Sequence, residues 1–249
     1  PMAALRRPMD IVCSAGADVL GDADTQREAM LRHSLDCLRE QLPLARALGF
    51  NGIEAYIRWN MAERESGVFD WSFYDTIIEL ITDHGMKLFP LLIVGSAYAL
   101  PTWFHQSGES HGFVCLEHGL SNPVQSIWHP AHKPHVTRFL QAFGSHYEPM
   151  NCLLGVRLGP SGCYGESQYP AQGDWGFRGE YMHLHIGIWA GDPCALADFQ
   201  RWLHARYGHV DALNEVWQEE HKAFDEVKLL LPEQCLSKRR RLDTYHWYT

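Results

Sequence analysis

The stretch Leu153–Pro170, LLGVRLGPSGCYGESQYP, decides how the rest of the chain is interpreted. It begins as a short apolar run bounded by turn residues, which is typical of a buried parallel strand. The following Gly159-Pro160-Ser161-Gly162 ends the strand and lets the backbone turn sharply. Glu166 comes directly after this turn. Because ligands in parallel α/β folds sit at the carboxyl ends of strands, Glu166 is a catalytic candidate, and the alternative is an ordinary solvated loop acid.

Strand and helix patterns alternate on both sides of this stretch. Such alternation favours a parallel sheet with right-handed crossovers. We count four βα units, so the sequence predicts a parallel (β/α) barrel of TIM type, present as its N-terminal half. Residues 1–249 are expected to form a single catalytic domain that is truncated at its C-terminal end. The predicted strands are 10–12, 52–59, 86–94 and 153–159, and the predicted helices are 31–48, 70–84, 134–147, 196–207 and a short one from Asp211 to Trp217.

Four local features refine this prediction. Pro43 predicts a kink or break in the first helix, and Asp70 is the predicted N-cap of the second. Pro90 predicts a bulge or an early end of the third strand, since it lacks an N–H for the ladder. The segment Gly95–His129 is expected to be a long functional or mobile loop.

Composition narrows the function. The net charge of −9 disfavours nucleic acid or an anionic membrane surface as the main partner. No apolar run is long enough to span a bilayer and no signal peptide is visible, so a cytoplasmic location is expected. Nine Trp and ten Tyr suit either core packing or a sugar-binding cleft, in which aromatic faces pack on apolar sugar surfaces.

Cysteine and histidine give no metal pattern in the sequence. The seven Cys contain no CxxC pair and are odd in number, which predicts reduced, mostly buried thiols. Among the fifteen His, His183-x-His185 and the scattered His105, His111 and His118 have no firm ligand spacing. We therefore predict no metal and no other cofactor.

Several motifs together resemble the (β/α)-barrel glycoside hydrolases, specifically β-amylases and the family 42 β-galactosidases. Trp59-Asn60-Met61-Ala62-Glu63 followed by Gly67–Trp71 resembles the signature at their second strand. Leu158–Gly162 running to Pro170 is similar to the β-amylase stretch that carries the general acid. Phe199–Trp217, with R-Y-G-x-V-D-x-L-N-x-x-W, resembles the helix after the acid/base strand, and Leu100-Pro101-Thr102-Trp103 resembles the segment after strand three.

The resemblance implies cleavage of O-glycosidic bonds by a pair of carboxyl groups. Glu166 is the expected acid or acid/base, and Tyr164, Tyr169 and Trp175 would provide the desolvated surroundings that raise its pKa. The chain departs from the family pattern, because Cys163 stands where β-amylases place the catalytic Glu and the Asn-Glu pair of family 42 does not occur here.

The same resemblance implies a carbohydrate substrate and further binding residues. Arg58 and Glu63 are candidates to orient an acid or bind a sugar hydroxyl, with a structural salt bridge as the alternative. Trp59, Trp103 and Trp175 are candidate sugar platforms, with core packing as the alternative for each. The second carboxylate has no convincing candidate; Glu180 is the fallback, and otherwise it lies beyond Thr249.

Two other classes of protein remain open. One is a non-catalytic carbohydrate-binding remnant of a glycosidase barrel. The other is a sugar isomerase or aldolase, which needs a metal-ligand set or a Schiff-base Lys, and the strand-associated Lys87 lies at the amino-terminal end of its strand. Besides the carbohydrate substrate, the expected partners are a second copy of the chain in a homo-oligomer or the missing C-terminal half of the barrel.

Overall fold

The computed structural model describes residues 9–16, 23–163, 168–171 and 182–249. Its centre is a parallel sheet of four strands in the order β1 (Val12–Ser14), β2 (Gly52–Arg58), β3 (Lys87–Ile93) and β6 (Arg157–Gly159). Sequential strands are therefore spatial neighbours, as in a barrel built by successive βα units. This arrangement confirms the predicted partial TIM-type barrel.

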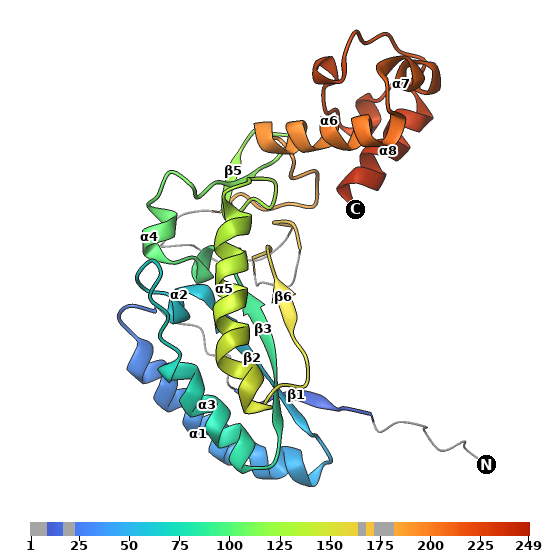
Figure 1. Ribbon diagram of the computed structural model, residues 1–249. Helices are drawn as coiled ribbons and strands as arrows, with labels where there is room; N and C mark the ends of the chain where they lie inside the picture. Colours follow the sequence, from blue (N-terminus) through green and yellow to red (C-terminus); the bar gives the residue numbers. More distant parts are fainter. Residues whose placement is uncertain (1–8, 17–22, 164–167, 172–181) are drawn as a thin grey trace, which may run out of the picture.

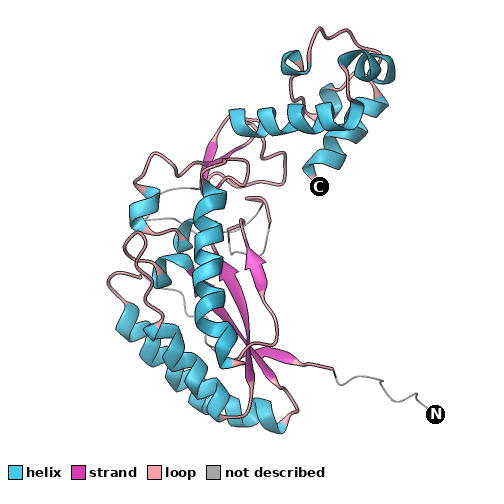
Figure 2. Ribbon diagram, viewed as in Figure 1, coloured by secondary structure: helices cyan, strands magenta, loops and turns pink. Residues whose placement is uncertain are grey.

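Helices cover one face of the sheet, as Figures 1 and 2 show. They are α1 (Arg27–Ala47), α3 (Ser72–Asp83) and α5 (His132–Tyr147). Alternate residues of β2 point into this layer and are buried, namely Ile53, Ala55 and Ile57. The opposite face carries a smaller apolar cluster of Leu91, Ile93 and Ala99, with Tyr56 and Tyr98 packed against it. An ion pair between Arg157 and Glu54 joins β6 to β2.

The first helix runs through its proline. A break at Pro43 was predicted, yet α1 continues from Arg27 to Ala47. Leu42 and Ala45, on either side of Pro43, are both buried against the sheet layer. Packing of this apolar face therefore outweighs the loss of one backbone hydrogen bond near the end of the helix.

The third strand also accepts its proline without interruption. Pro90 pairs with Ala55 of β2 in an unbroken register from Gly52 to Arg58, so the predicted bulge or early end is wrong. The Leu88 N–H points towards the β6 side, where it donates to the Cys152 carbonyl at 2.8 Å. Two residues on, the missing N–H of Pro90 faces the same side, at a point where β6 has not yet begun.

The fourth strand is shorter and more exposed than predicted. Only Arg157–Gly159 forms β6, although Leu153 makes an isolated bridge to Leu88. Val156 and Leu158 are exposed, so the expectation of a buried strand is wrong. The physical reason is that β6 lies at the edge of the sheet and has a strand neighbour on one side only.

The segment after β3 is structured rather than one long loop. It contains η1 (Ala97–Ala99) and α4 (Thr102–His105). An antiparallel hairpin of β4 (Gly112–Val114) and β5 (Ser121–Gln125) follows. The predicted loop Gly95–His129 is thus corrected to two short helical turns and a hairpin. The short strands escaped prediction because none has more than five residues.

The segment after β2 includes α2 (Trp59–Ala62) and the start of α3. Trp71 rather than Asp70 is the N-cap of α3, although the Asp70 carboxylate still accepts a hydrogen bond from the Ser72 N–H at 3.0 Å. The predicted cap is therefore one residue too early, and its side chain still satisfies a first-turn donor.

A group of helices lies beyond the carboxyl ends of the strands (Figure 1). It contains α6 (Pro193–Tyr207), α7 (Val210–Trp217) and α8 (Lys238–Tyr248). The cap of α7 is His209, whose side chain accepts from the Ala212 N–H at 3.2 Å, rather than the predicted Asp211. The remaining turns are η2 (Glu148–Met150), η3 (Phe224–Glu226) and η4 (Pro232–Gln234).

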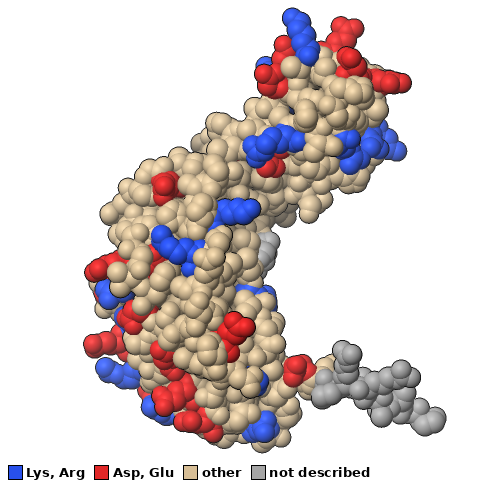
Figure 3. Space-filling model, in the orientation of Figure 1, with Lys and Arg blue, Asp and Glu red and all other residues tan. Residues whose placement is uncertain are grey.

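Charges on the visible surface do not form a patch of one sign. Figure 3 shows acidic and basic side chains at both ends of the molecule and few over its middle. In the described part of the chain, no helix is long and apolar enough to cross a membrane.

Candidate active site

The exits of β3 and β6 are locked together at the carboxyl end of the sheet. The Val94 N–H donates to the Gly159 carbonyl at 3.0 Å, and the Ser96 hydroxyl donates to the Gly162 carbonyl at 2.6 Å. Gly95 lies so close to Pro160 that an added Cβ would sit 1.8 Å from the Pro160 carbonyl oxygen. The turn that follows β6 is therefore fixed against the exit of its neighbour.

Glu166 falls in the segment 164–167, which lies outside the described residues, together with Tyr164. Trp175 and Glu180 also lie outside them. The two ends of the segment are described and meet each other. Gly162 has a positive φ of 89° and packs against the Gln168 backbone, and the Ser161 hydroxyl donates to the Gln168 carbonyl at 2.8 Å. The chain on both sides of Glu166 is thus anchored at the strand exit.

Tyr169 leads from this turn to the helical group. Its ring stacks on Tyr248 with the centroids 4.2 Å apart, and its hydroxyl donates to the Tyr248 carbonyl at 2.9 Å. Burial raises the pKa of Tyr169 above its usual value. These contacts position the residue, and its predicted role in substrate binding stays a prediction.

Glu63 is the centre of a buried polar network behind the exit of β2. Its carboxylate accepts from the Trp59 indole N–H at 2.7 Å and from the Gly67 N–H at 2.7 Å, and it pairs with Arg138 of α5. Trp59 and Glu63 are both 0% exposed. Because neither side chain reaches solvent, the structure replaces the predicted substrate-binding roles of Trp59 and Glu63 with core packing and a structural salt bridge.

Trp103 and Arg58 border the same network. The Trp103 indole N–H donates to the Glu63 carbonyl oxygen at 3.0 Å, and its ring meets Trp59 edge to face at 5.7 Å. Arg58 is buried, its backbone N–H donates to the Tyr74 hydroxyl at 2.8 Å, and its guanidinium lies 5.9 Å from the Tyr98 ring centroid. Trp103 is only partly buried, so one edge of this aromatic group reaches the surface.

A group of metal-type donors was not predicted from the sequence. The structure brings Cys115 and His118 of the hairpin together with His183 and His185, although the two pairs are more than sixty residues apart. The Cys115-x-x-His118 spacing was the signal that would have drawn attention to the first pair.

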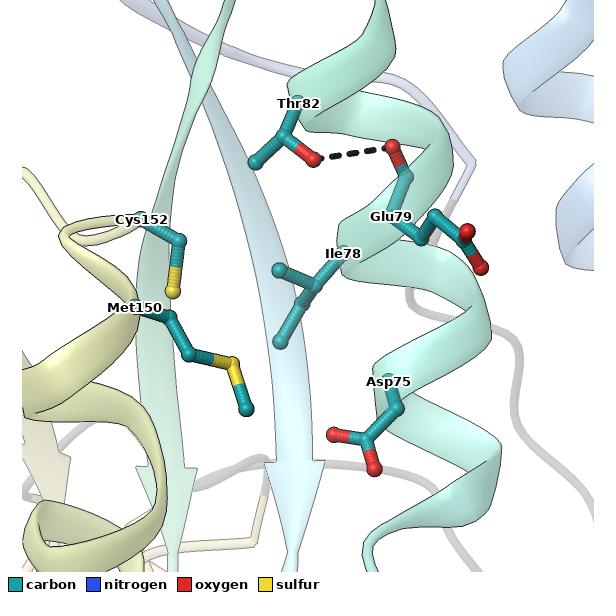
Figure 4. A pocket seen from close by; sticks show the side chains of 6 residues that line it. All are labelled: Asp75, Ile78, Glu79, Thr82, Met150 and Cys152. Carbon is teal, nitrogen blue, oxygen red and sulfur yellow. Dashed lines mark hydrogen bonds between the residues drawn. The ribbon is translucent and has the colours of Figure 1, made fainter.

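A pocket on the outer surface lies far from the strand exits. It is formed between α3 and the end of the α5–η2 segment, and Figure 4 shows its six lining side chains. Asp75 in its wall is held by His146 at 2.8 Å and by the Tyr147 hydroxyl at 3.0 Å. Since barrel enzymes place their chemistry at the carboxyl ends of the strands, this pocket is not the candidate active site.

The sheet, its strand-exit turn and the helices outside it define a partial barrel of the glycoside hydrolase class. The catalytic domain of the β-amylase from Paenibacillus polymyxa has the same fold, with a TM-score of 0.62 and 17% identity over 89% of this chain and 53% of that one. The family model of glycoside hydrolase family 42, described as beta-galactosidase, matches residues 32–247. The chain belongs to that family.

The relatives that match this chain in sequence include β-galactosidases and β-amylases. The chain is 27% identical to the beta-galactosidase BgaB of Geobacillus sp. over 72% of its own length and 24% of that protein. It is 21% identical to the thermophilic beta-amylase of Thermoanaerobacterium thermosulfurigenes over 77% of its own length and 37% of that protein. The chain thus spans about a quarter to a third of these relatives.

Proposed function

We propose that this chain is the N-terminal part of a glycoside hydrolase barrel and takes part in the cleavage of O-glycosidic bonds. The complete enzyme would be β-galactosidase-like or another exo-acting glycosidase. The family match over residues 32–247 carries this proposal. In the proposed mechanism Glu166 protonates the leaving oxygen, and a second carboxylate, supplied by the remainder of the barrel, attacks the anomeric carbon or activates water.

The anchored ends of the turn support the role of Glu166. Ser161, Gly162 and Gln168 tie residues on both sides of the segment to the exits of β3 and β6. Only four residues separate Cys163 from Gln168, so the reach of the segment is limited to a few ångströms per residue. Tyr169, two residues after the segment, is itself held by its stacking and hydrogen bond with Tyr248.

A chromogenic β-galactoside assay on the protein that contains this chain and the remainder of the barrel tests this role. Glu166→Gln keeps the size and hydrogen-bonding capacity of the side chain but cannot donate a proton, so kcat should fall by about 10²–10⁴-fold with unchanged circular dichroism. Glu65→Gln, an exposed acid elsewhere, is the matched control and should keep normal turnover. Near-normal turnover of the Glu166→Gln protein would remove Glu166 from the mechanism.

The second candidate function is carbohydrate binding without hydrolysis. The presence of Cys163 at the position where β-amylases carry the catalytic Glu favours it. Measured on this chain together with the remainder of the barrel, binding of galactose or maltose by calorimetry without release of chromophore from galactosides or glucosides would establish binding in place of catalysis.

A further inference from the structure

A compact group of four donor side chains lies on the hairpin side of the molecule. His118 Nδ1 is 3.3 Å from Cys115 Sγ and 3.3 Å from His183 Nε2. One donor atom from each of Cys115, His118, His183 and His185 lies within 4.8 Å of all the others. The three imidazole centroids are 4.9–5.2 Å apart.

These separations match the edges of a zinc tetrahedron. With Zn–N bonds of about 2.0–2.1 Å and a Zn–S bond of about 2.3 Å, tetrahedral donors lie about 3.3 Å apart for N···N and about 3.6 Å apart for N···S. The N···N separation of 3.3 Å between His118 and His183 has this value, and the S···N separation of 3.3 Å between Cys115 and His118 is about 0.3 Å shorter than the tetrahedral edge. The donor atom of His185 lies within 4.8 Å of the other three.

An orphaned atom of His185 points to a missing ligand partner. Its Nδ1 lies 3.1 Å from the Ile186 carbonyl oxygen, which selects the tautomer with the proton on Nδ1. Its Nε2 is buried and has no hydrogen-bond partner among the described residues. A backbone carbonyl on one ring nitrogen and a free lone pair on the other is the usual arrangement of a metal-bound histidine.

The Cys115 side chain is also held in place by a hydrogen bond. The His118 backbone N–H donates to Cys115 Sγ at 3.1 Å, which holds the sulfur beside the three imidazole rings. Glu117 adds negative charge nearby, with its Oε2 4.0 Å from His185 Nε2 and its Oε1 accepting from the Ile188 N–H at 2.7 Å.

The backbone around the donors is fixed without a metal. The Leu116 N–H donates to the Ile188 carbonyl at 2.7 Å, and the Asn122 amide donates to the His183 carbonyl at 2.8 Å. Gly187 leaves room for the group, because a Cβ there would sit 2.4 Å from the His185 ring. Hydrogen bonds that do not involve the donor atoms therefore hold the Cys115–His118 pair next to the His183–His185 pair.

We propose that Cys115, His118, His183 and His185 bind one Zn²⁺ ion. Thiolate and imidazole donors in this number suit zinc, and four protein ligands leave no open position for a substrate, so the site is structural. The ion would cross-link the β4–β5 hairpin to the segment that leads into α6, and so connect the sheet to the helical group. This inference does not depend on the proposed hydrolase activity.

Metal content and a cobalt spectrum test the site directly. The full chain, incubated with Zn²⁺ and dialysed against a weak chelator, should retain one zinc per chain by mass spectrometry. Replacement with Co²⁺ should give the thiolate-to-cobalt charge-transfer band and the strong visible bands of tetrahedral coordination.

Two substitutions separate the site from adventitious binding. His183→Gln, on a half-buried side chain, should lower zinc affinity at least tenfold and abolish the zinc-induced rise in Tm, and Cys115→Ser should remove the charge-transfer band. His204→Gln and Cys194→Ser, which alter the same residue types on α6, should change neither. Unchanged zinc affinity in the folded His183→Gln protein, or a cobalt complex without a thiolate band, would overturn the proposal.

Discussion

Glu63 illustrates how a residue with a family signature can serve the fold rather than the substrate. Its carboxylate receives two hydrogen bonds, from Trp59 and Gly67, and an ion pair from Arg138, all while shielded from solvent. The network joins the segment that follows β2 to α5, which packs on the helix-covered face of the sheet. A buried carboxylate of this kind stabilises the fold only while all of its partners are present.

Glu63→Gln should therefore destabilise the protein by about 2–4 kcal/mol, because the Arg138 pair is lost and one amide hydrogen opposes a donor. Urea unfolding followed by tryptophan fluorescence measures the change. Glu65→Gln, two residues away and exposed, should shift the free energy of unfolding by less than about 0.5 kcal/mol. Equal stability of the two variants would show that the network contributes little.

At the scale of elements, the joint between β3 and β6 depends on a glycine. Gly95 allows the backbone to approach Pro160, and any Cβ would overlap the Pro160 carbonyl oxygen at 1.8 Å. The overlap involves backbone on both sides, so it cannot be relieved by a side-chain rotation. Separation of the two exits would shift the turn that leads to Glu166.

Gly95→Ala should lower the free energy of unfolding by about 1–3 kcal/mol. Gly144→Ala is the opposite control, since Gly144 lies inside α5 with nothing within 4 Å of an added Cβ, and it should raise stability by about 0.5–1 kcal/mol. Thermal unfolding of the two variants and the unsubstituted protein measures the expected decrease and the expected increase in stability. A neutral Gly95→Ala would mean that the two strand exits are not locked.

The elements that sequence could predict are those whose periodicity is strong and local. The alternation of β2, α3 and β3 was sufficient to predict the partial barrel, and α5 and α6 begin within three residues of their predicted starts. The β4–β5 hairpin was missed because its strands are too short to show a period. The effect of Pro90 was predicted wrongly because its missing N–H costs no strand hydrogen bond. The neighbouring strand β6 begins to pair with β3 only at Leu91, which the sequence does not reveal.

The candidate site was predictable only in part, for the same reason. Glu166 could be predicted because it follows a strand–turn pattern in one continuous stretch, and its catalytic role stays a prediction. The burial of Trp59 and Glu63 depends on Arg138 and on α4, which lie far along the chain. The Cys–His group joins residues 65 positions apart, a separation that no local spacing rule detects.

At the scale of the whole molecule, two of the apolar cores formed by the described residues are much larger than the others. One lies between the sheet and α1, α3 and α5, and the other lies inside the α6–α8 group, around Phe199, Trp217 and Trp247. Aromatic contacts such as Tyr169 on Tyr248 and Trp128 on Trp247 connect the second core to a smaller cluster around Phe113, Val124 and Trp189. Separate cores joined by a limited interface tend to open as separate cooperative units.

Asp243 is the residue whose change tests this division. Its buried carboxylate accepts from the Trp217 indole N–H at 2.8 Å and from the Tyr207 hydroxyl, and it faces Arg206 at 3.2 Å. Asp243→Asn removes the buried counter-charge of both Arg206 and Arg239, which should weaken the second core by about 2–4 kcal/mol.

Hydrogen exchange measures where this weakening is felt. Exchange should accelerate throughout α6–α8 in the Asp243→Asn protein while β2 and β3 keep their protection, and Glu63→Gln should give the reverse pattern. Asp211→Asn, an exposed acid on α7, should leave both regions unchanged. Faster exchange in β2 and β3 by the same factor as in α6–α8 would instead show that the interface couples the two cores into one unit. The zinc ion proposed at the hairpin, when bound, should move the protein towards that coupled behaviour, because it ties the segment before α6 to the sheet side of the interface.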